Sequence, residues 1–144
     1  MDRTLLIYWS KTGNTKTFID YFVHHSTNEV DVIDVSKENI DASILDNYKK
    51  ICIGCYTWNN GKIPPKAKRF IINNSHHFKN KDVFIFGSGN TTYTYFCAAV
   101  DNIEIIMNDL QSNVEYKVKF DNQFHESDFT EDHQTELKKA IQKF

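Results

Sequence analysis

The chain has 144 residues, 40% of them hydrophobic and 25% charged, which is enough for one domain over 1–144 whose core needs no disulfide. Its net charge of −2 excludes a nucleic-acid binder that works through bulk positive charge. Since no apolar run approaches the ~20 residues of a membrane span and no signal peptide opens the chain, we expect a cytoplasmic protein.

Strand and helix patterns alternate along the chain. Apolar runs bounded by turn residues predict strands at 3–9, 30–35, 50–55, 82–87 and 114–120. Four helices are expected. The first covers 14–25, the second is opened by Pro64, the third follows the loop after the fourth strand and reaches about Leu110, and the last is capped by Thr130. The connection 36–46 is polar and partly helical. This alternation predicts a three-layer, doubly wound α/β fold with a five-stranded parallel sheet, in which 114–120 is an edge strand.

The two outer helices are expected to pack through apolar stripes. These stripes are Phe18, Ile19, Phe22 and Val23 in the first helix, and Leu137, Ala140, Ile141 and Phe144 in the last.

The loop after the first strand has the chemistry of a phosphate site. A phosphate at the start of the following helix would meet free backbone N–H groups and the positive end of the helix dipole. The hydroxyls of Ser10, Thr12 and Thr15 would add further donors. Because neither G-x-x-x-x-G-K-[ST] nor G-x-G-x-x-G is present, the pattern favours the terminal phosphate of a small nucleotide. An ordinary strand-to-helix turn is the alternative.

Two further loops should meet this one, because ligands of doubly wound sheets bind beyond the carboxyl ends of the strands. The loop after the third strand carries Trp58, and the loop after the fourth carries Tyr93. Two aromatic rings that face each other across a crevice form a slot for one planar heterocycle. A Trp58 in the core or in a partner interface is the alternative.

These loops resemble those of the flavodoxin family. The matching patterns are S/T-x-T-G-x-T after the first strand, a T-W loop after the third, and Gly87-Ser88-Gly89 continued by Tyr93 and Phe96-Cys97-Ala98-Ala99-Val100-Asp101. The resemblance implies a flavodoxin-like fold with strand order 2-1-3-4-5 and a short-chain member, since 114–124 leaves no room for a long insertion. It also implies an FMN-dependent one-electron carrier, not an enzyme, that shuttles between semiquinone and hydroquinone.

By that resemblance, three sets of residues bind FMN. The phosphate set is Ser10, Lys11, Thr12, Gly13, Asn14 and Thr15. Thr57 would reach the phosphate or ribityl chain, while Trp58 and Tyr93 would cover the two faces of the flavin ring. The remaining positions, whose backbone groups lie in the two later loops, are Asn59, Gly61, Gly89, Asn90 and Cys97. The implied partners are a flavodoxin reductase or similar donor and an acceptor enzyme, both docking near the flavin edge of a monomer.

The chain departs from the family at three loop positions. Asn59 stands where the family has the glycine of a peptide flip, so stabilisation of the radical is expected to be weaker. Asn60 and Asn90 replace acidic residues, which with Lys11 predicts a less reducing hydroquinone. The weak net charge of −2 predicts less salt-dependent docking than in strongly acidic relatives.

Other reactive side chains suggest no second chemistry. Cys52 and Cys55 fall inside a strand, where a redox C-x-x-C is not expected, and His76 with His77 lacks the spacing of a metal site. The cations Lys62, Lys66, Lys68 and Arg69 form either a solvated face or a docking surface for an acidic partner.

Two other functions fit the sequence less well. A flavodoxin-like activator of class Ib ribonucleotide reductase also binds FMN, and Gly61-Lys62-Ile63-Pro64 resembles that family, but its R-N-[FW]-G run is absent. A phosphorylatable receiver or FMN-free module needs an acidic pair after the first strand, where this chain has Trp9 and Ser10.

Overall fold

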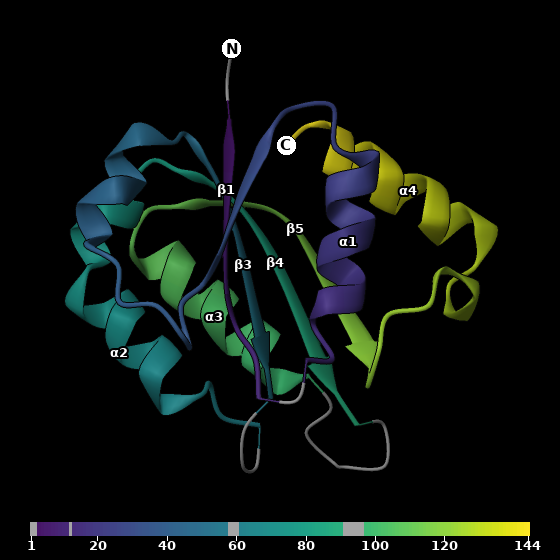
Figure 1. Cartoon of the computed structure of the whole chain (residues 1–144), viewed down its shortest axis with the longest axis horizontal. Coiled ribbons are helices and arrows are strands. Elements are labelled where there is room, and N and C mark those ends of the chain that lie inside the picture. Colours follow the sequence, from purple (N-terminus) through teal and green to yellow (C-terminus); the bar gives the residue numbers. More distant parts are fainter. Residues whose placement is uncertain (1–2, 12, 58–60, 91–96) are drawn as a thin grey trace.

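The computed structural model describes residues 3–11, 13–57, 61–90 and 97–144. In these residues, five parallel strands form one sheet in the order β2-β1-β3-β4-β5 (Figure 1). The strands are β1 (Thr4–Trp9), β2 (Val30–Asp34), β3 (Lys50–Tyr56), β4 (Asp82–Gly89) and β5 (Asn113–Asp121). The predicted doubly wound fold, its strand order and the edge position of β5 are therefore confirmed.

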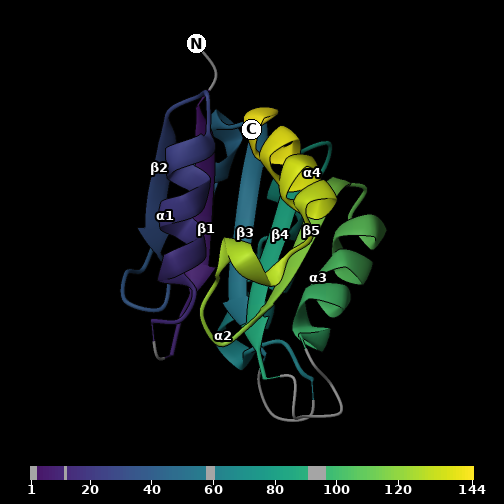
Figure 2. The same ribbon diagram turned by 90° about the vertical axis from the view of Figure 1, so that its right-hand side faces the viewer.

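Helices cover both faces of the sheet. The α-helices are α1 (Lys16–His25), α2 (Pro65–Asn73), α3 (Ala98–Asp109) and α4 (Glu131–Gln142), and the 3-10 helices are η1 (Ala42–Asn47), η2 (Ser75–Phe78) and η3 (Glu126–Asp128). Helices α2 and α3 lie on one face, while α1 and α4 lie on the other (Figures 1 and 2). No helix among the described residues is both long and apolar enough to cross a membrane.

Alternation of side chains along the strands builds the two cores. Leu5 and Ile7 of β1 point to the core under α2 and α3, whereas Leu6 points to the core under α1 and α4. Because both faces of a central parallel strand are covered, β1 reads as an almost unbroken apolar run.

The phenylalanines of the chain concentrate under α1 and α4. Phe18 of α1 lies at the centre, with ring centroids 4.7 Å from Phe86, 5.0 Å from Phe124 and 5.7 Å from Phe120. The high aromatic content is thus explained by this core, which anchors α1 to the sheet.

Some sequence-based boundaries differ from the structure. Helix α1 begins at Lys16 and not at residue 14, because Asn14 and Thr15 still belong to the turn that follows Gly13, and Thr15 is the N-cap residue. Val23 is 44% exposed, so its place in the buried stripe of α1 was wrong. Thr130 caps α4 as predicted, its hydroxyl accepting a hydrogen bond from the His133 N–H at 3.2 Å.

The carboxyl ends of the strands lie together at one edge of the sheet, at the lower end of Figure 1. Register brings them level: Trp9 of β1 pairs with Cys55 of β3, and Tyr56 of β3 pairs with Ser88 of β4. The described parts of the loops after β1, β3 and β4 therefore start from neighbouring points, as expected for a ligand site at this edge.

Candidate functional site

The loop between β1 and α1 turns at Gly13. Its positive φ of 80° favours glycine, and a Cβ at this position would meet no atom within 4 Å. The Gly13 N–H donates a hydrogen bond to Ser10 Oγ at 2.9 Å, and the Gly13 carbonyl accepts one from Lys16 N–H at 3.2 Å. The Gly13 N–H is therefore held by Ser10, whereas the sequence alone suggested that it was free.

Thr15 occupies the N-cap position of α1 but does not act as a cap. Its side chain makes no capping hydrogen bond, its residue is 1% exposed, and its Oγ1 has no hydrogen-bond partner among the described residues. The first turn of α1 contains no acidic side chain that would neutralise the positive end of the helix dipole. The start of α1 thus offers a buried hydroxyl and a positive dipole end to an anion.

Thr17 fastens this loop to a distant part of the chain. Its hydroxyl donates to the Asn14 carbonyl at 3.1 Å and accepts the Phe124 N–H at 2.8 Å, which joins the start of α1 to the segment after β5. No local sequence pattern indicates this role of Thr17, since its partner Phe124 lies far away along the chain.

Thr57 follows β3 and repeats the situation of Thr15. Its N–H donates to the Ser88 carbonyl at 3.1 Å, which fixes the backbone beside the end of β4. Its Oγ1 is buried and has no hydrogen-bond partner in the described part of the chain. Buried polar groups are almost always paired, so two such hydroxyls on loops at one edge indicate a missing partner.

The end of the second loop is anchored to α3. Gly61 is buried with a positive φ of 83°, and its carbonyl accepts a hydrogen bond from Asn102 Nδ2 at 3.0 Å. Asn102 is a positioning residue that no local sequence pattern indicates. This contact sets where the chain enters α2.

Gly89 and Cys97 are in close contact at the two ends of the third loop. A Cβ on Gly89 would lie 2.8 Å from Cys97 Sγ and 2.9 Å from Cys97 N, so only glycine allows this approach. Cys97 has a positive φ of 50°, and its thiol donates toward the carbonyls of Gly87 and Phe120, each at 3.6 Å. Cys97 therefore closes the loop structurally.

The three cysteines are buried and unpaired, as the sequence indicated for Cys52 and Cys55. Burial raises the pKa of both Cys55 and Cys97 to about 12, and it raises the pKa of Cys52 as well. They are therefore neutral thiols near pH 7 and not nucleophiles.

The remaining predicted positions divide into two groups. Lys11 is exposed, and Asn14 and Asn90 are partly buried, all three at the carboxyl edge. Thr12, Trp58, Asn59 and Tyr93 lie outside the described residues, as does Asn60.

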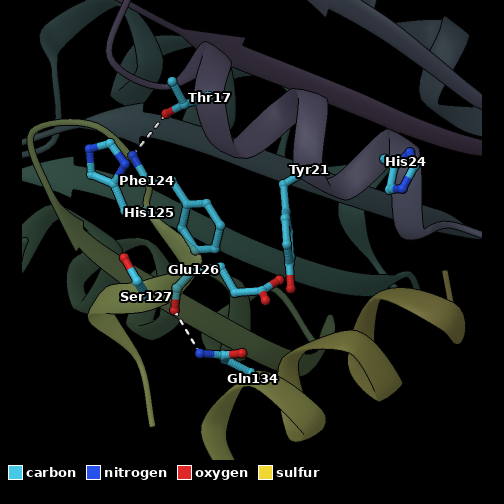
Figure 3. Close-up of a pocket in the computed structure, with 8 residues that line it drawn as sticks. All are labelled: Thr17, Tyr21, His24, Phe124, His125, Glu126, Ser127 and Gln134. Atoms are coloured by element: carbon cyan, nitrogen blue, oxygen red, sulfur yellow. Dashed lines mark hydrogen bonds between the residues drawn. The ribbon is translucent and has the colours of Figure 1, made fainter. Parts of the chain in front are cut away.

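A separate hollow lies on the α1 side of the molecule (Figure 3). It has a volume of about 690 Å³ and is lined by Thr17, Tyr21, His24, Phe124, His125, Glu126, Ser127 and Gln134. Burial and the nearby Glu126 carboxylate raise the pKa of Tyr21. None of the predicted site residues that the structure describes lines this hollow, and the same part of the chain contains no cluster of three metal-ligating side chains.

The sequence pattern of the flavodoxin family matches residues 6–136, which is most of the chain. The chain belongs to the flavodoxin family. Members of this family are electron-transfer flavoproteins whose cofactor is FMN, and they are not enzymes. The resemblance to the flavodoxin family, the electron-transfer class and the FMN cofactor are thereby confirmed.

Individual relatives agree with this membership. A flavodoxin of Maridesulfovibrio salexigens is 37% identical over 111 residues, which cover 72% of this chain and 75% of the relative. Flavodoxin 2 of Bacillus cereus superposes with a TM-score of 0.75 at 25% identity, covering 96% of this chain and 97% of that one. A short-chain flavodoxin associated with a non-canonical PDU bacterial microcompartment shares the fold, with a TM-score of 0.77, 19% identity, and coverage of 98% and 97%.

Proposed function

We propose that this chain holds FMN at the carboxyl edge of its sheet and passes electrons one at a time, alternating between its half-reduced and fully reduced states. One observation carries the proposal: Thr15 and Thr57 each bury a hydroxyl without a partner among the described residues. An unpaired buried hydroxyl costs about 1–3 kcal/mol. A ligand rich in anionic and hydroxyl oxygens, such as the phosphate and ribityl chain of FMN, would satisfy both groups.

The phosphate would be held by the loop before α1. Its residues are Ser10, Lys11, Thr12, Gly13, Asn14 and Thr15. The N-terminus of α1 contributes the positive end of its dipole, Thr15 a buried hydroxyl and Lys11 an exposed cation. Thr57 would donate to the phosphate or to the ribityl chain.

The flavin ring would lie between the second and third loops. Trp58 and Tyr93 are assigned to its two faces, and the residues assigned to its polar edge are Asn59, Gly89, Asn90 and Cys97. Gly61 is a further position in the second loop. The Gly89–Cys97 contact and the bond from Asn102 to Gly61 hold the described ends of these loops in place. Such support keeps the donors in position without reorganisation during electron transfer.

FMN, when bound, supplies reversible reduction in one-electron steps. The charges that the protein places near the flavin set the potential at which its fully reduced, more negative state forms. Asn90 brings no charge to a loop where the family has an acidic residue, and Asp101 nearby in sequence is paired with Lys117 and Lys119 at 3.0 and 2.6 Å. Loss of one carboxylate ~8 Å away, at an effective dielectric of ~20, raises the potential by on the order of tens of millivolts after screening.

The chain acts with redox partner proteins, as its family does. We infer a flavodoxin reductase or similar protein as electron donor, an acceptor enzyme that docks near the flavin edge, and a cytoplasmic monomer. Gel filtration of the FMN-loaded protein would test the monomer directly.

Anaerobic stepwise reduction of the FMN-loaded protein tests the proposed function. We expect yellow colour and loss of FMN fluorescence at a 1:1 ratio, then two separated reduction steps with a strong visible band of the half-reduced state. Failure to bind FMN would contradict the site. Binding with overlapping steps would contradict the one-electron role and favour the activator of ribonucleotide reductase.

A further inference from the structure

Charge is strongly segregated along this chain. Residues 47–81 contain eight Lys and Arg and no Asp or Glu. The rest of the chain contains nine Lys and Arg and nineteen Asp and Glu. The net charge of −2 is therefore the sum of +8 in this segment and −10 in the remainder of the chain. Net charge alone, which predicts weak electrostatic steering, does not describe such a molecule.

The structure places half of these cations beside the proposed flavin site. Lys62, Lys66, Lys68 and Arg69, which we call the α2 patch, are all exposed. Helix α2 starts at the end of the sheet where the strands terminate, so its N-terminal part lies beside the carboxyl edge (Figure 1). The buried carbonyl of Gly61, bonded to Asn102, and the buried side chain of Ile63 fix the start of this segment.

The α2 patch contributes nothing visible to the stability of the fold. None of its four side chains takes part in an ion pair within the described residues, unlike Lys117 and Lys119 on β5. Lys66 lies in the first turn of α2, where the helix dipole disfavours a cation and where no acidic residue compensates. Helix α2 packs against the sheet through the buried Ala67 and Ile71 and the partly buried Phe70, none of which is charged. An unneutralised cluster at this position is best explained by a partner that neutralises it.

We propose that the α2 patch receives an acidic, Asp- and Glu-rich face of the protein that exchanges electrons at the carboxyl edge. The inference rests on the proposed function, since it needs a redox group at that edge. Complementary charge steers the encounter and orients the partner over the electron-transfer site, and it acts mainly on the association rate. The same field repels a basic partner from this side of the edge.

Two haem proteins of opposite charge test the surface without knowledge of the natural partner. The FMN-loaded protein, fully reduced, is mixed in a stopped-flow instrument with the acidic haem domain of cytochrome b5 or with basic cytochrome c, at low and high salt. The variant K66E/R69E reverses two charges of the patch, and K62E/K68E reverses the other two. The control K139E/K143E makes the same change in net charge on exposed residues of α4 and the segment after it, on the opposite face of the sheet.

We expect reduction of the cytochrome b5 domain to slow with salt in the unmodified protein. Either patch variant should slow it about tenfold at low salt, whereas the control should change it less than about twofold. Reduction of cytochrome c should not slow in the patch variants. Equal effects of patch and control variants, or no effect of either, would overturn the inference while leaving the FMN function standing. Failure of the unmodified protein to bind FMN would overturn both, and it is seen before any kinetics.

Discussion

Thr15 and Thr57 stand out at the residue scale because the fold buries their hydroxyls without using them. Both are threonines at loop positions next to the strand ends, and neither hydroxyl has a partner among the described residues. A fold that keeps such groups accepts a cost in its apo state that a ligand removes. Removal of either hydroxyl should therefore weaken ligand binding without lowering the stability of the apoprotein.

We predict that T15V and T57V weaken FMN binding at least tenfold each, because each loses a hydrogen bond to an anionic or hydroxyl oxygen. The free energy of unfolding of the apoprotein should stay unchanged or rise by up to about 1 kcal/mol, because an unpaired polar group is removed. Fluorescence titration with FMN and urea unfolding of the apoprotein measure the two quantities.

T4V is the matched control. Thr4 is fully buried at the start of β1, and its hydroxyl donates to the Phe144 carbonyl at the end of the sheet away from the proposed site. Its loss should lower stability by about 1 kcal/mol and leave FMN affinity unchanged. If T15V destabilised the apoprotein as T4V does, Thr15 Oγ1 would be a paired structural group and the argument for a ligand would fail.

At the scale of elements, a glycine decides how β3 and β4 pack. Gly54 of β3 pairs with Phe86 of β4, and a Cβ at Gly54 would lie 2.1 Å from Cζ of the Phe86 ring. The ring covers the bare backbone of Gly54 and continues into the phenylalanine core beside Phe18. Packing against Phe86 therefore requires glycine at this position. Backbone conformation does not, because the φ of Gly54 is not positive.

G54A should destabilise the protein by about 1–3 kcal/mol through overpacking. Because the clashing atoms belong to one side chain, F86L should relieve part of the cost, so the double variant should be more stable than the sum of the single effects predicts. Chemical denaturation of the four proteins in this cycle tests the coupling. Strict additivity would show that the ring is not what excludes a Cβ.

A second contact between elements should control the cofactor site from a distance. T17V removes the bonds that join α1 to Asn14 and to the N–H of Phe124, which is then left without this partner. We expect a loss of about 1–3 kcal/mol in stability and a several-fold weaker affinity for FMN, because the loop before α1 loses its support.

T135V provides the comparison for Thr17. The Thr135 hydroxyl also donates to a backbone carbonyl, that of Glu131 at 3.0 Å, but within exposed α4. It should change stability by less than about 0.5 kcal/mol and FMN affinity not at all. An FMN affinity of T17V equal to that of the unmodified protein would remove Thr17 from the support of the site.

At the scale of the whole molecule, stability should depend on pH through the β2 edge. Asp31 accepts hydrogen bonds from Arg3 Nε at 2.9 Å and from Tyr48 Oη at 2.6 Å, and these bonds lower the pKa of Asp31 to about 2. A lowered carboxyl pKa stabilises the folded state above the ordinary value near 3.8, and this contribution disappears as the pH falls toward 2.

D31N should therefore lower the free energy of unfolding at pH 7, by less than about 1 kcal/mol because solvent screens this partly exposed group. The difference from the unmodified protein should shrink between pH 4 and pH 2. Urea unfolding at pH 7, 4 and 2 measures it, with D128N as control because the exposed Asp128 side chain makes no hydrogen bond or ion pair with the described residues. A difference that stayed constant with pH would contradict the assignment to Asp31.

Features that depend on local sequence were predictable, whereas contacts between residues far apart in the chain were not. The strands and helices followed from apolar runs and turn residues, and the convergence of loops followed from the rule for parallel sheets. Val23 was misplaced because helical spacing does not tell how far the buried stripe extends. Thr17 and Asn102 were missed because their partners, Phe124 and the Gly61 carbonyl, lie on other elements.

The sequence by itself determined the strands and helices, the family through its three loop patterns, and the segregation of charge. Each of these depends on residues that lie close together in the sequence. Tertiary structure alone decided that the Gly13 N–H is held by Ser10, that Thr15 and Thr57 bury unpaired hydroxyls, and that the α2 patch borders the carboxyl edge. These features depend on which atoms meet after folding. Hydrogen bonds and burial depend on which groups come into contact. For groups far apart in the chain, the local sequence does not show which contacts form.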